Sequence, residues 1–422
     1  MNDCLIKDLL AFLKESPTAF HAAKELGNRL ALSGFTPLSL NDSWALKPSH
    51  SYFVENSGTV CAFSIPDRKI KSFDIFASHT DSPALKLKPN PLHVKKQKIF
   101  LKVEVYGSPI LTTWMSKDLA IAGRSFVITP SGIEQILHYH DENQLIIPNL
   151  AVHLDVQNND KKTINKELEL CPLLTAGTTK DPSKILTKLL GRPIHTILSS
   201  DLFLVPTQEP KILGLDSDLL ASYRLDNLAS CHCILAALTY PRENLDSKAL
   251  ISLFYNHEEV GSMSDEGAKS PFFLQIMERI AFSQNMNLED YHLAKNNSTV
   301  TSVDMAHAYN PQYSQSYDPL NSPVMGKGVV LKHNANLSYS TSGKSGARII
   351  QKCREKNIPS QFYAIESNQR CGSTIGPIIS STTGIPTVDI GIPQLSMHSS
   401  REVISIHDYQ KLYKLLKSLL EG

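Results

Sequence analysis

The residues with the clearest chemical potential are two adjacent carboxylates, Glu258 and Glu259, which follow the apolar run 249–255. Such a run is typical of a buried β-strand. Charged side chains at its end need a partner or a metal ion, because removing a charge from water is costly. Neighbouring side chains of a strand point to opposite faces, but a bend at its end lets both address one site. One carboxylate could then bind a cation while the other accepts a proton, as in a metal-dependent hydrolase.

Four further places put a side chain that can bind a metal at the start of a predicted helix or just after a predicted strand. Because ligands of open α/β sheets bind at the carboxyl ends of the strands, we expect these side chains at one rim. Such nitrogen and oxygen donors suit zinc, manganese or cobalt, and a bridging carboxylate can hold two ions about 3.5–4 Å apart. The places are His79 and Asp81 after strand 73–77, Asp226 before helix 228–238, Asp304 after strand 300–303 and His398 after strand 386–390.

Each of these residues also has an ordinary structural interpretation. An Asp before a helix, such as Asp226, is more often an N-cap than a ligand, and Asp304 or His398 alone could lie in a turn or loop. Cys231-His232-Cys233 looks like a metal motif, but residues i and i+2 of a helix point in different directions, which favours buried core cysteines. The metal interpretation therefore depends on all the residues occupying equivalent places in the fold.

Composition favours a cytoplasmic protein that binds neither nucleic acid nor membranes. The 422 residues include 42 Lys and Arg against 41 Asp and Glu, so no overall field attracts a polyanion. No apolar run approaches the ~20 residues that span a bilayer, and the first residues lack a signal-peptide pattern. Seven cysteines, an odd number scattered along the chain, do not indicate a disulfide framework.

The chain is expected to form two domains, one inserted into the other. Short apolar strands alternate with helical patterns at about 52–81 and again from about 222 onward, which indicates an α/β sheet covered by helices. The region between them is rich in Val, Ile and Thr, which predicts a strand-rich insertion. The predicted boundaries are 1–91 and 213–422 for the main domain and 92–212 for the insertion.

Seven short motifs are spread along the chain: Ser16-Pro17-Thr18-Ala19-Phe20-His21-Ala22, Ser78-His79-Thr80-Asp81-Ser82-Pro83, Arg224-Leu225-Asp226-Asn227, His257-Glu258-Glu259-Val260-Gly261-Ser262, Asp304-Met305-Ala306-His307-Ala308, Cys371-Gly372-Ser373-Thr374-Ile375-Gly376-Pro377 and Gln394-Leu395-Ser396-Met397-His398-Ser399-Ser400-Arg401-Glu402. In this order they resemble the aspartyl aminopeptidase family of zinc metallopeptidases. The resemblance implies an α/β fold, in which a three-layer catalytic domain with a mixed sheet carries an inserted strand-rich dimerisation domain. It also implies a metallo-aminopeptidase that releases N-terminal Asp or Glu from peptides.

The resemblance further implies a centre with two divalent ions, zinc being expected and manganese or cobalt the alternatives. Glu258 would be the general base. Asp81 would accept the other ring N–H of His79 and so fix the tautomer of that ring. The implied ligands are His79 and Asp304 for one ion, Glu259 and His398 for the other, and Asp226 as the bridge.

The same resemblance implies substrate-binding residues and a homo-oligomer. Lys332 would face the carboxylate of an acidic substrate, assisted by Tyr339, whereas the residues alone favour a solvated lysine at position 332. His153, by sequence alone a strand histidine, would be lent to the active site of a neighbouring subunit. The family pattern is a dodecamer built from dimers.

Two features differ from the family pattern. Asn310 stands where many relatives have His, and the segment 326–328 before Lys332 is short and glycine-bearing. A related metallo-aminopeptidase or deacylase with neutral specificity is therefore the first alternative. A non-catalytic assembly or cargo protein on this scaffold is the second, and it predicts the loss of a ligand or of the base, all of which the chain retains.

Overall fold

The chain folds into two units that both draw on more than one stretch of sequence. One comprises Met1–Asp81, Pro210–Met397 and Glu402–Gly422, and the other comprises Ser82–Glu209 and His398–Arg401. The second unit thus begins earlier than the expected residue 92, because strand Ala84–Lys95 pairs along its length with other strands of that unit. The computed structural model describes residues 2–155, 159–175, 177, 183–191, 196–241 and 245–421.

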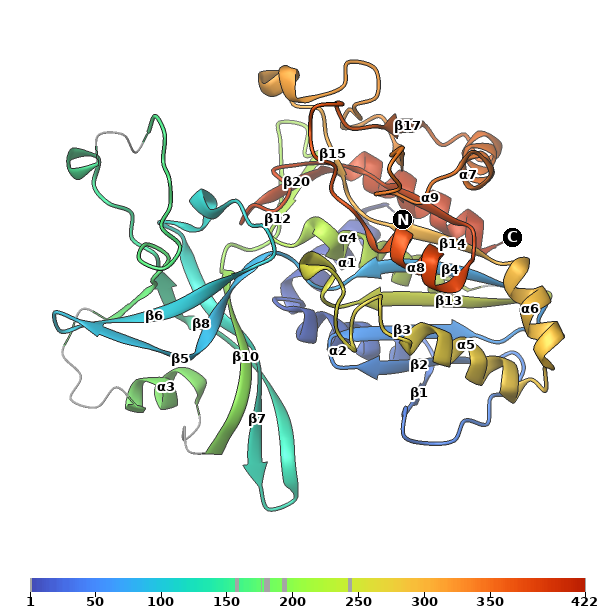
Figure 1. Cartoon of the computed structure of the whole chain (residues 1–422), viewed down its shortest axis with the longest axis horizontal. Helices are drawn as coiled ribbons and strands as arrows, with labels where there is room; N and C mark the ends of the chain where they lie inside the picture. The colour runs from blue at the N-terminus through green and yellow to red at the C-terminus, as the bar shows by residue number, and fades with distance from the viewer. Residues whose placement is uncertain are drawn as a thin grey trace. The chain divides into compact units, whose positions relative to one another are not determined.

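The first unit is built on a mixed sheet with nine strands in the order β1-β2-β3-β13-β4-β14-β18-β16-β17 (Figure 1). The central strands β13, β4, β14 and β18 run parallel to one another, so their carboxyl ends meet at one edge. The strands are β1 (Thr36–Leu38), β2 (Ser51–Asn56), β3 (Thr59–Ser64), β4 (Ser72–His79), β13 (Lys248–Tyr255), β14 (Thr299–Val303), β16 (Val329–Lys332), β17 (Ser360–Tyr363) and β18 (Thr387–Gly391).

Helices cover both faces of this sheet and form two hydrophobic cores. Side chains of β4 alternate between them, since Phe76 packs into one core while Ile75 and Ala77 pack into the other. This arrangement confirms the predicted three-layer α/β domain. The helices of the first core are α1 (Asn2–Glu15), α2 (Ala19–Leu32), α4 (Leu225–Leu238), α7 (Gly343–Glu355) and α9 (Ile406–Leu420), and those of the second are α5 (Phe272–Ser283), α6 (Leu288–Asn296) and α8 (Ile375–Thr383).

A second, five-stranded sheet in the first unit brings together segments that follow β14 and β18. Strand β15 follows β14 in the chain, strand β19 follows β18, and the two strands pair parallel to each other. The 3₁₀ helices η4 (Glu258–Val260) and η5 (Pro311–Ser316) lie in loops of the same unit. The strands are β11 (Lys211–Leu213), β12 (Leu219–Ser222), β15 (Ala306–His307), β19 (Pro393–Leu395) and β20 (Glu402–Ser405).

The second unit is a closed barrel, which confirms the predicted strand-rich domain. The sequence alone predicts a strand at His153, but this residue lies in the exposed 3₁₀ helix η2 (Val152–Leu154). Strand β8 ends before Pro148, which has no N–H to donate to a strand ladder. The other elements are β5 (Ala84–Lys95), β6 (Lys98–Tyr106), η1 (Leu111–Trp114), β7 (Asp118–Thr129), β8 (Gly132–Ile146), β9 (Leu173–Thr175), α3 (Ser183–Leu190) and β10 (Ile197–Pro206).

None of the helices among the described residues combines the length and the apolar character that crossing a bilayer requires. The cysteines of the Cys231-His232-Cys233 segment are buried in α4 and have free thiols. The core interpretation of this segment is therefore confirmed.

A buried histidine links α4 to the helices on either side of it. His232 Nε2 lies 2.9 Å from Asp8 Oδ2 of α1, and its Nδ1 contacts the hydroxyl of Tyr409 in α9. A neutral ring with its proton on Nε2 satisfies both contacts, because it donates to Asp8 and accepts from Tyr409. Burial lowers the pKa of His232, and the hydrogen bond from His232 lowers the pKa of Asp8 to about 2.

We predict that His232 makes the stability of the chain depend on pH. The unfolded chain takes up a proton on this histidine near pH 6.5 while the folded chain resists it, so stability falls as the pH drops below that value. His232→Gln, whose amide can replace both hydrogen bonds, should flatten this slope by up to about 1.4 kcal/mol per pH unit. Urea unfolding at several pH values between 5 and 7.5 measures the slope, and an unchanged slope would contradict a neutral buried ring.

Candidate metal centre

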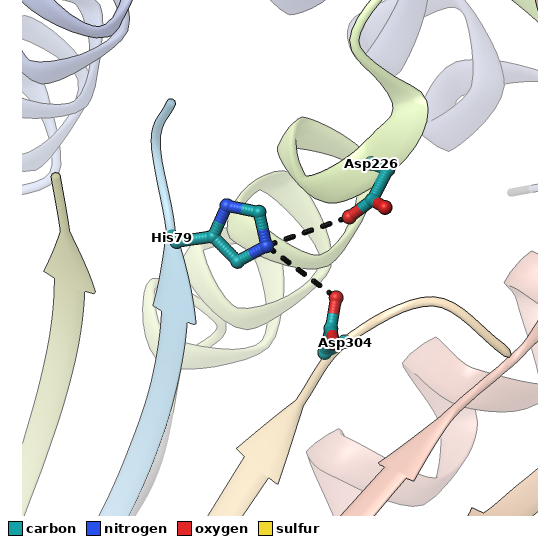
Figure 2. A group of neighbouring side chains, drawn as sticks. All are labelled: His79, Asp226 and Asp304. Atoms are coloured by element: carbon teal, nitrogen blue, oxygen red, sulfur yellow. Dashed lines mark ion pairs between the residues drawn. The ribbon is translucent and has the colours of Figure 1, made fainter. Parts of the chain in front are cut away.

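Three buried side chains from separate elements converge at the carboxyl edge of the central strands. His79 ends β4, Asp226 lies at the start of α4, and Asp304 follows β14 (Figure 2). Nε2 of His79 lies 3.4 Å from Asp226 Oδ1 and 3.4 Å from Asp304 Oδ1. All three side chains can direct a ligand atom to one point, because these atoms lie within 4.8 Å of one another.

The histidine of this cluster is held with one ring nitrogen directed toward the carboxylates. Nδ1 of His79 lies 3.0 Å from the backbone carbonyl oxygen of Asp81, so in the neutral ring Nδ1–H donates there and Nε2 carries the lone pair that a metal ion would need. The carboxylate of Asp81, which was the expected acceptor, is more distant at 3.5 Å. Burial alone would lower the pKa of His79, but its contacts with Asp226, Asp304 and Asp81 hold that pKa well above its usual value.

The two adjacent carboxylates lie in η4 at the end of β13, next to the histidine. Glu258, Glu259 and His79 form a second group whose ligand atoms lie within 4.8 Å, and Glu259 comes equally close to Asp226. Asp81 orients this turn, since its carboxylate accepts hydrogen bonds from the backbone N–H of Glu258 at 3.0 Å and of Glu259 at 3.1 Å. Burial, reinforced by the neighbouring carboxylates, raises the pKa of Glu258 to about 8.

The chemistry of this donor set fits a divalent cation. Four carboxylates, those of Asp226, Glu258, Glu259 and Asp304, gather around one imidazole. Carboxylates this close repel one another unless a cation lies among them. Nitrogen and oxygen donors of this kind are the ligands that zinc takes from His, Asp and Glu. The residues present therefore fit the metal that the sequence predicted.

Four further residues hold the cluster in place, and the sequence did not assign them a role. Arg224, buried and with a φ of 67°, donates to the backbone carbonyl of Thr80 and, at 3.2 Å, to that of Pro17. This contact connects the Ser16-Pro17 motif to the metal site. The other three bonds are from Asn227 Nδ2 to the Val303 carbonyl at 2.9 Å, from Cys231 Sγ to the His79 carbonyl at 3.0 Å, and from the Asp226 N–H to Glu402 Oε2 at 3.0 Å.

For three of these residues the only signal in the sequence is a position close to predicted ligands, and Cys231 has no such signal. Arg224 and Asn227 flank the Leu225-Asp226 pair, and Glu402 ends the motif that contains His398. Hydrogen bonds to backbone carbonyls of distant segments cannot be read from a sequence without the fold.

Lys332 is buried rather than solvated, so the solvated interpretation is wrong. Its side chain is 2 % exposed, and its Nζ lies 2.9 Å from Asp304 Oδ2. The same Nζ lies 5.2 Å from the centre of the Tyr339 ring, which is also buried. Lys332 and Tyr339 thus adjoin the metal cluster through Asp304.

The other residues near the expected pocket have local roles. Asn310 is the N-cap of η5 and accepts a hydrogen bond from the backbone N–H of Gln312 at 3.2 Å. The ring of His307 meets that of Tyr363 edge-on, with centroids 5.9 Å apart. Asp408 at the start of α9 accepts from the N–H groups of Gly326 and Gly328, which fixes the segment leading to Lys332.

His398 and His153 both lie in the second unit. Nδ1 of His398 lies 3.2 Å from the backbone carbonyl oxygen of Ser108 in the same unit. An Nδ1–H that donates there leaves Nε2 with a lone pair for a metal ion. The roles of His398 as a ligand and of His153 as a residue shared between subunits remain predictions.

We predict that Asp81→Asn weakens metal binding about 10–100-fold, as is typical when a residue that orients ligands is lost. An amide can accept from only one of the two N–H groups of the turn, and its own NH₂ opposes the other. Competition with a chromogenic chelator measures the affinity. Asp74→Asn is the matched control, because Asp74 is a buried residue near the start of β4, the strand that precedes Asp81. Equal metal affinity in Asp81→Asn and the unmodified protein would contradict this role.

Comparison with known proteins agrees with the geometry of this site. Residues 12–420 match the family described as aminopeptidase I zinc metalloprotease (M18). A probable M18 family aminopeptidase 2 of Borreliella burgdorferi is 36% identical over 415 residues, which cover 97% of this chain and 96% of the relative.

Solved structures show the same similarity. One chain from a cryo-EM structure of the Ape4 and Nbr1 complex has a TM-score of 0.94 and 32% identity, covering 100% of this chain and 86% of that one. An M18 family aminopeptidase from Thermotoga maritima has a TM-score of 0.88 and 26% identity, covering 100% of this chain and 96% of that one. Family match, curated relatives and fold agree with the buried donor cluster, and the chain belongs to the M18 family of zinc metallo-aminopeptidases.

Proposed function

We propose that the chain removes N-terminal Asp or Glu from peptides through two divalent metal ions, with Glu258 as the general base. The observation that carries the proposal is the group of four carboxylates and one imidazole at the edge of the sheet, in which His79, Asp226 and Asp304 are buried. In this proposal Asp226 would be shared by the two ions, since it lies close to both His79 and Glu259. His79 and Asp304 would hold one ion, and Glu259 and His398 the other.

His398 is included because of its place in the chain. It lies between β19 and β20, both of which belong to the first unit. β20 begins with Glu402, whose carboxylate accepts from the backbone N–H of Asp226. This short connection keeps His398 within a few residues of the metal cluster, and its contact with Ser108 supports the tautomer that a metal ligand needs.

The chemistry assigned to the chain's own residues follows from their places. Divalent ions held here supply Lewis acidity and make water a stronger acid near neutral pH. Glu258 takes the proton from the attacking water and passes it to the leaving amine. Asp81 keeps Glu258 in place through the backbone of the turn. A positioned acid–base group of this kind contributes typically about 10²–10⁴-fold to the rate.

Acidic specificity is proposed from the buried ammonium group of Lys332. An ammonium group has three donors, and Asp304 takes one of them. The others can address the carboxylate of a substrate's first side chain, next to the Tyr339 ring. The pairing with Asp304 is also the observation that favours the alternative of neutral specificity, because it partly neutralises Lys332.

Assembly into a homo-oligomer is proposed from the surface around His153. Leu150, Val152 and Leu154 are 50%, 48% and 74% exposed, which is unusual for three large apolar side chains so close together. A neighbouring subunit would cover them and receive His153. A monomer with full activity would contradict this part of the proposal. A cytoplasmic location is supported by the free thiols of all seven cysteines.

We predict that the two adjacent carboxylates have separable functions. Glu258→Ala should keep its metal and lose turnover about 10²–10⁴-fold, because only the proton acceptor is removed. Glu259→Ala should lose metal as well as turnover. Elemental analysis after dialysis gives the metal content, and full occupancy in Glu259→Ala would argue against the assignment of the pair.

Hydrolysis of aspartyl-, glutamyl- and leucyl-arylamides, each with and without a chelator, tests the reaction and its specificity. We expect chelator-sensitive cleavage that favours the acidic substrates. Lys332→Met should reduce this preference about 10–100-fold, as expected for a lost hydrogen bond between charged groups. Its metal content serves as the control, because Lys332 also contacts Asp304. A preference for leucine would keep the mechanism and overturn the specificity.

A further inference from the structure

A buried carboxylate that the proposed mechanism does not use lies directly beside the Lys332 strand. Asp389 is fully buried in β18, between β14 and β16. β16 and β18 pair antiparallel through Val330 with Gly391 and Leu331 with Ile390. The same register places Asp389 opposite Lys332, and residues opposite one another share a face of the sheet.

The carboxylate of Asp389 binds two separate loops. It accepts from the backbone N–H of Ser340 at 2.6 Å and from the hydroxyl of Thr374 at 2.7 Å. Its backbone adds a second contact to the first loop, because the Asp389 N–H donates to Thr341 Oγ1 at 3.0 Å. One side chain therefore fixes the loop that follows Tyr339 and the loop that follows Cys371.

These two loops meet at the expected substrate pocket. Tyr339 belongs to a small apolar cluster against which Cys371 packs. The ring of Tyr339 is also the one that lies beside the Lys332 ammonium group. A shift of either loop would consequently change the surroundings of Lys332.

The packing around Asp389 leaves little freedom for the carboxylate. A Cβ atom built on Gly376, two residues after Thr374, would lie 2.3 Å from Asp389 Oδ1. Glycine at position 376 thus allows α8 to approach the carboxylate closely. This contact accounts for a glycine in the Cys371–Pro377 motif that no catalytic role explains.

We propose that Asp389 is a positioning residue of the substrate pocket, which holds Tyr339 in place beside Lys332 through its hydrogen bonds to Ser340 and Thr374. The inference rests on the proposed recognition of acidic substrates by Lys332. In this inference Asp389 positions Tyr339 through its hydrogen bonds and not through its negative charge. An asparagine can keep both bonds, since its oxygen accepts from Ser340 and its NH₂ can donate to the Thr374 hydroxyl.

Asp389→Ala and Asp389→Asn separate the hydrogen bonds from the charge. In Asp389→Ala, the KM for aspartyl-arylamide should rise about tenfold, the loss expected for hydrogen bonds to a charged group, while kcat changes less than about threefold. The KM for leucyl-arylamide should change less than about threefold, because that substrate does not use Lys332. Asp389→Asn should resemble the unmodified enzyme. Asp74→Ala, at the other end of the sheet, controls for general destabilisation.

Hydrogen exchange gives a readout that does not depend on specificity. The Ser340 amide should exchange faster in Asp389→Ala than in the unmodified protein, and Asp389→Asn should keep it protected. If Asp389→Ala fails to fold, Thr374→Val removes one of the two bonds and should raise the KM for aspartyl-arylamide by a smaller factor.

The outcomes for the two proposals are distinguishable. A preference of the unmodified enzyme for leucine would overturn acidic specificity and with it the effect assigned to Lys332. Unchanged exchange of Ser340 in Asp389→Ala would overturn the positioning role itself. The positioning role would also be overturned if Asp74→Ala gave an equal rise in the KM for aspartyl-arylamide, or if Asp389→Asn raised that KM as much as Asp389→Ala.

Discussion

The constraint on which this structure depends is the convergence of several carboxylates on one imidazole. Asp226, Glu258, Glu259 and Asp304 lie within reach of His79 at one edge of the central sheet, and Asp226, Asp304 and His79 are buried. Despite burial, the contacts of His79 with Asp226 and Asp304 hold its pKa well above the usual value, and burial together with the neighbouring carboxylates raises the pKa of Glu258. Divalent cations among these carboxylates would offset their repulsion, so metal binding and folding at this edge are expected to be coupled.

Geometry at the site is maintained mainly by hydrogen bonds between side chains and the backbone. Arg224 donates to the backbone carbonyl of Thr80, and Asn227 donates to the carbonyl at the end of β14. Glu402 accepts from the backbone N–H of Asp226. Asp81 binds two successive N–H groups of the turn that carries the predicted base. Backbone groups move less than side chains, so these bonds fix the positions of the metal ligands. The ligand atoms of those side chains stay directed toward the metal site.

Two kinds of error separate the sequence predictions from the structure. His153 was expected in a strand and lies in a 3₁₀ helix, a local error, since Pro148 already marks the end of the preceding strand. The other errors arise where contacts between distant segments decide the outcome. Lys332 alone suggested a solvated residue, and only the sheet order shows that it is buried against Asp304. The expected acceptor for His79 was the Asp81 carboxylate, but the backbone carbonyl lies closer and the carboxylate binds the turn instead.

By itself, the sequence determined the fold class, the strand-rich insertion and the residues with metal-binding chemistry. These follow from local patterns, since apolar strands end in charged residues and parallel strands share an edge. The tertiary structure decided which of those residues meet, which nitrogen of His79 faces the carboxylates, and how Asp389 connects two loops to the strand of Lys332. Such relations are set by strand order and by hydrogen bonds across long stretches of chain, and no local pattern in the sequence encodes them.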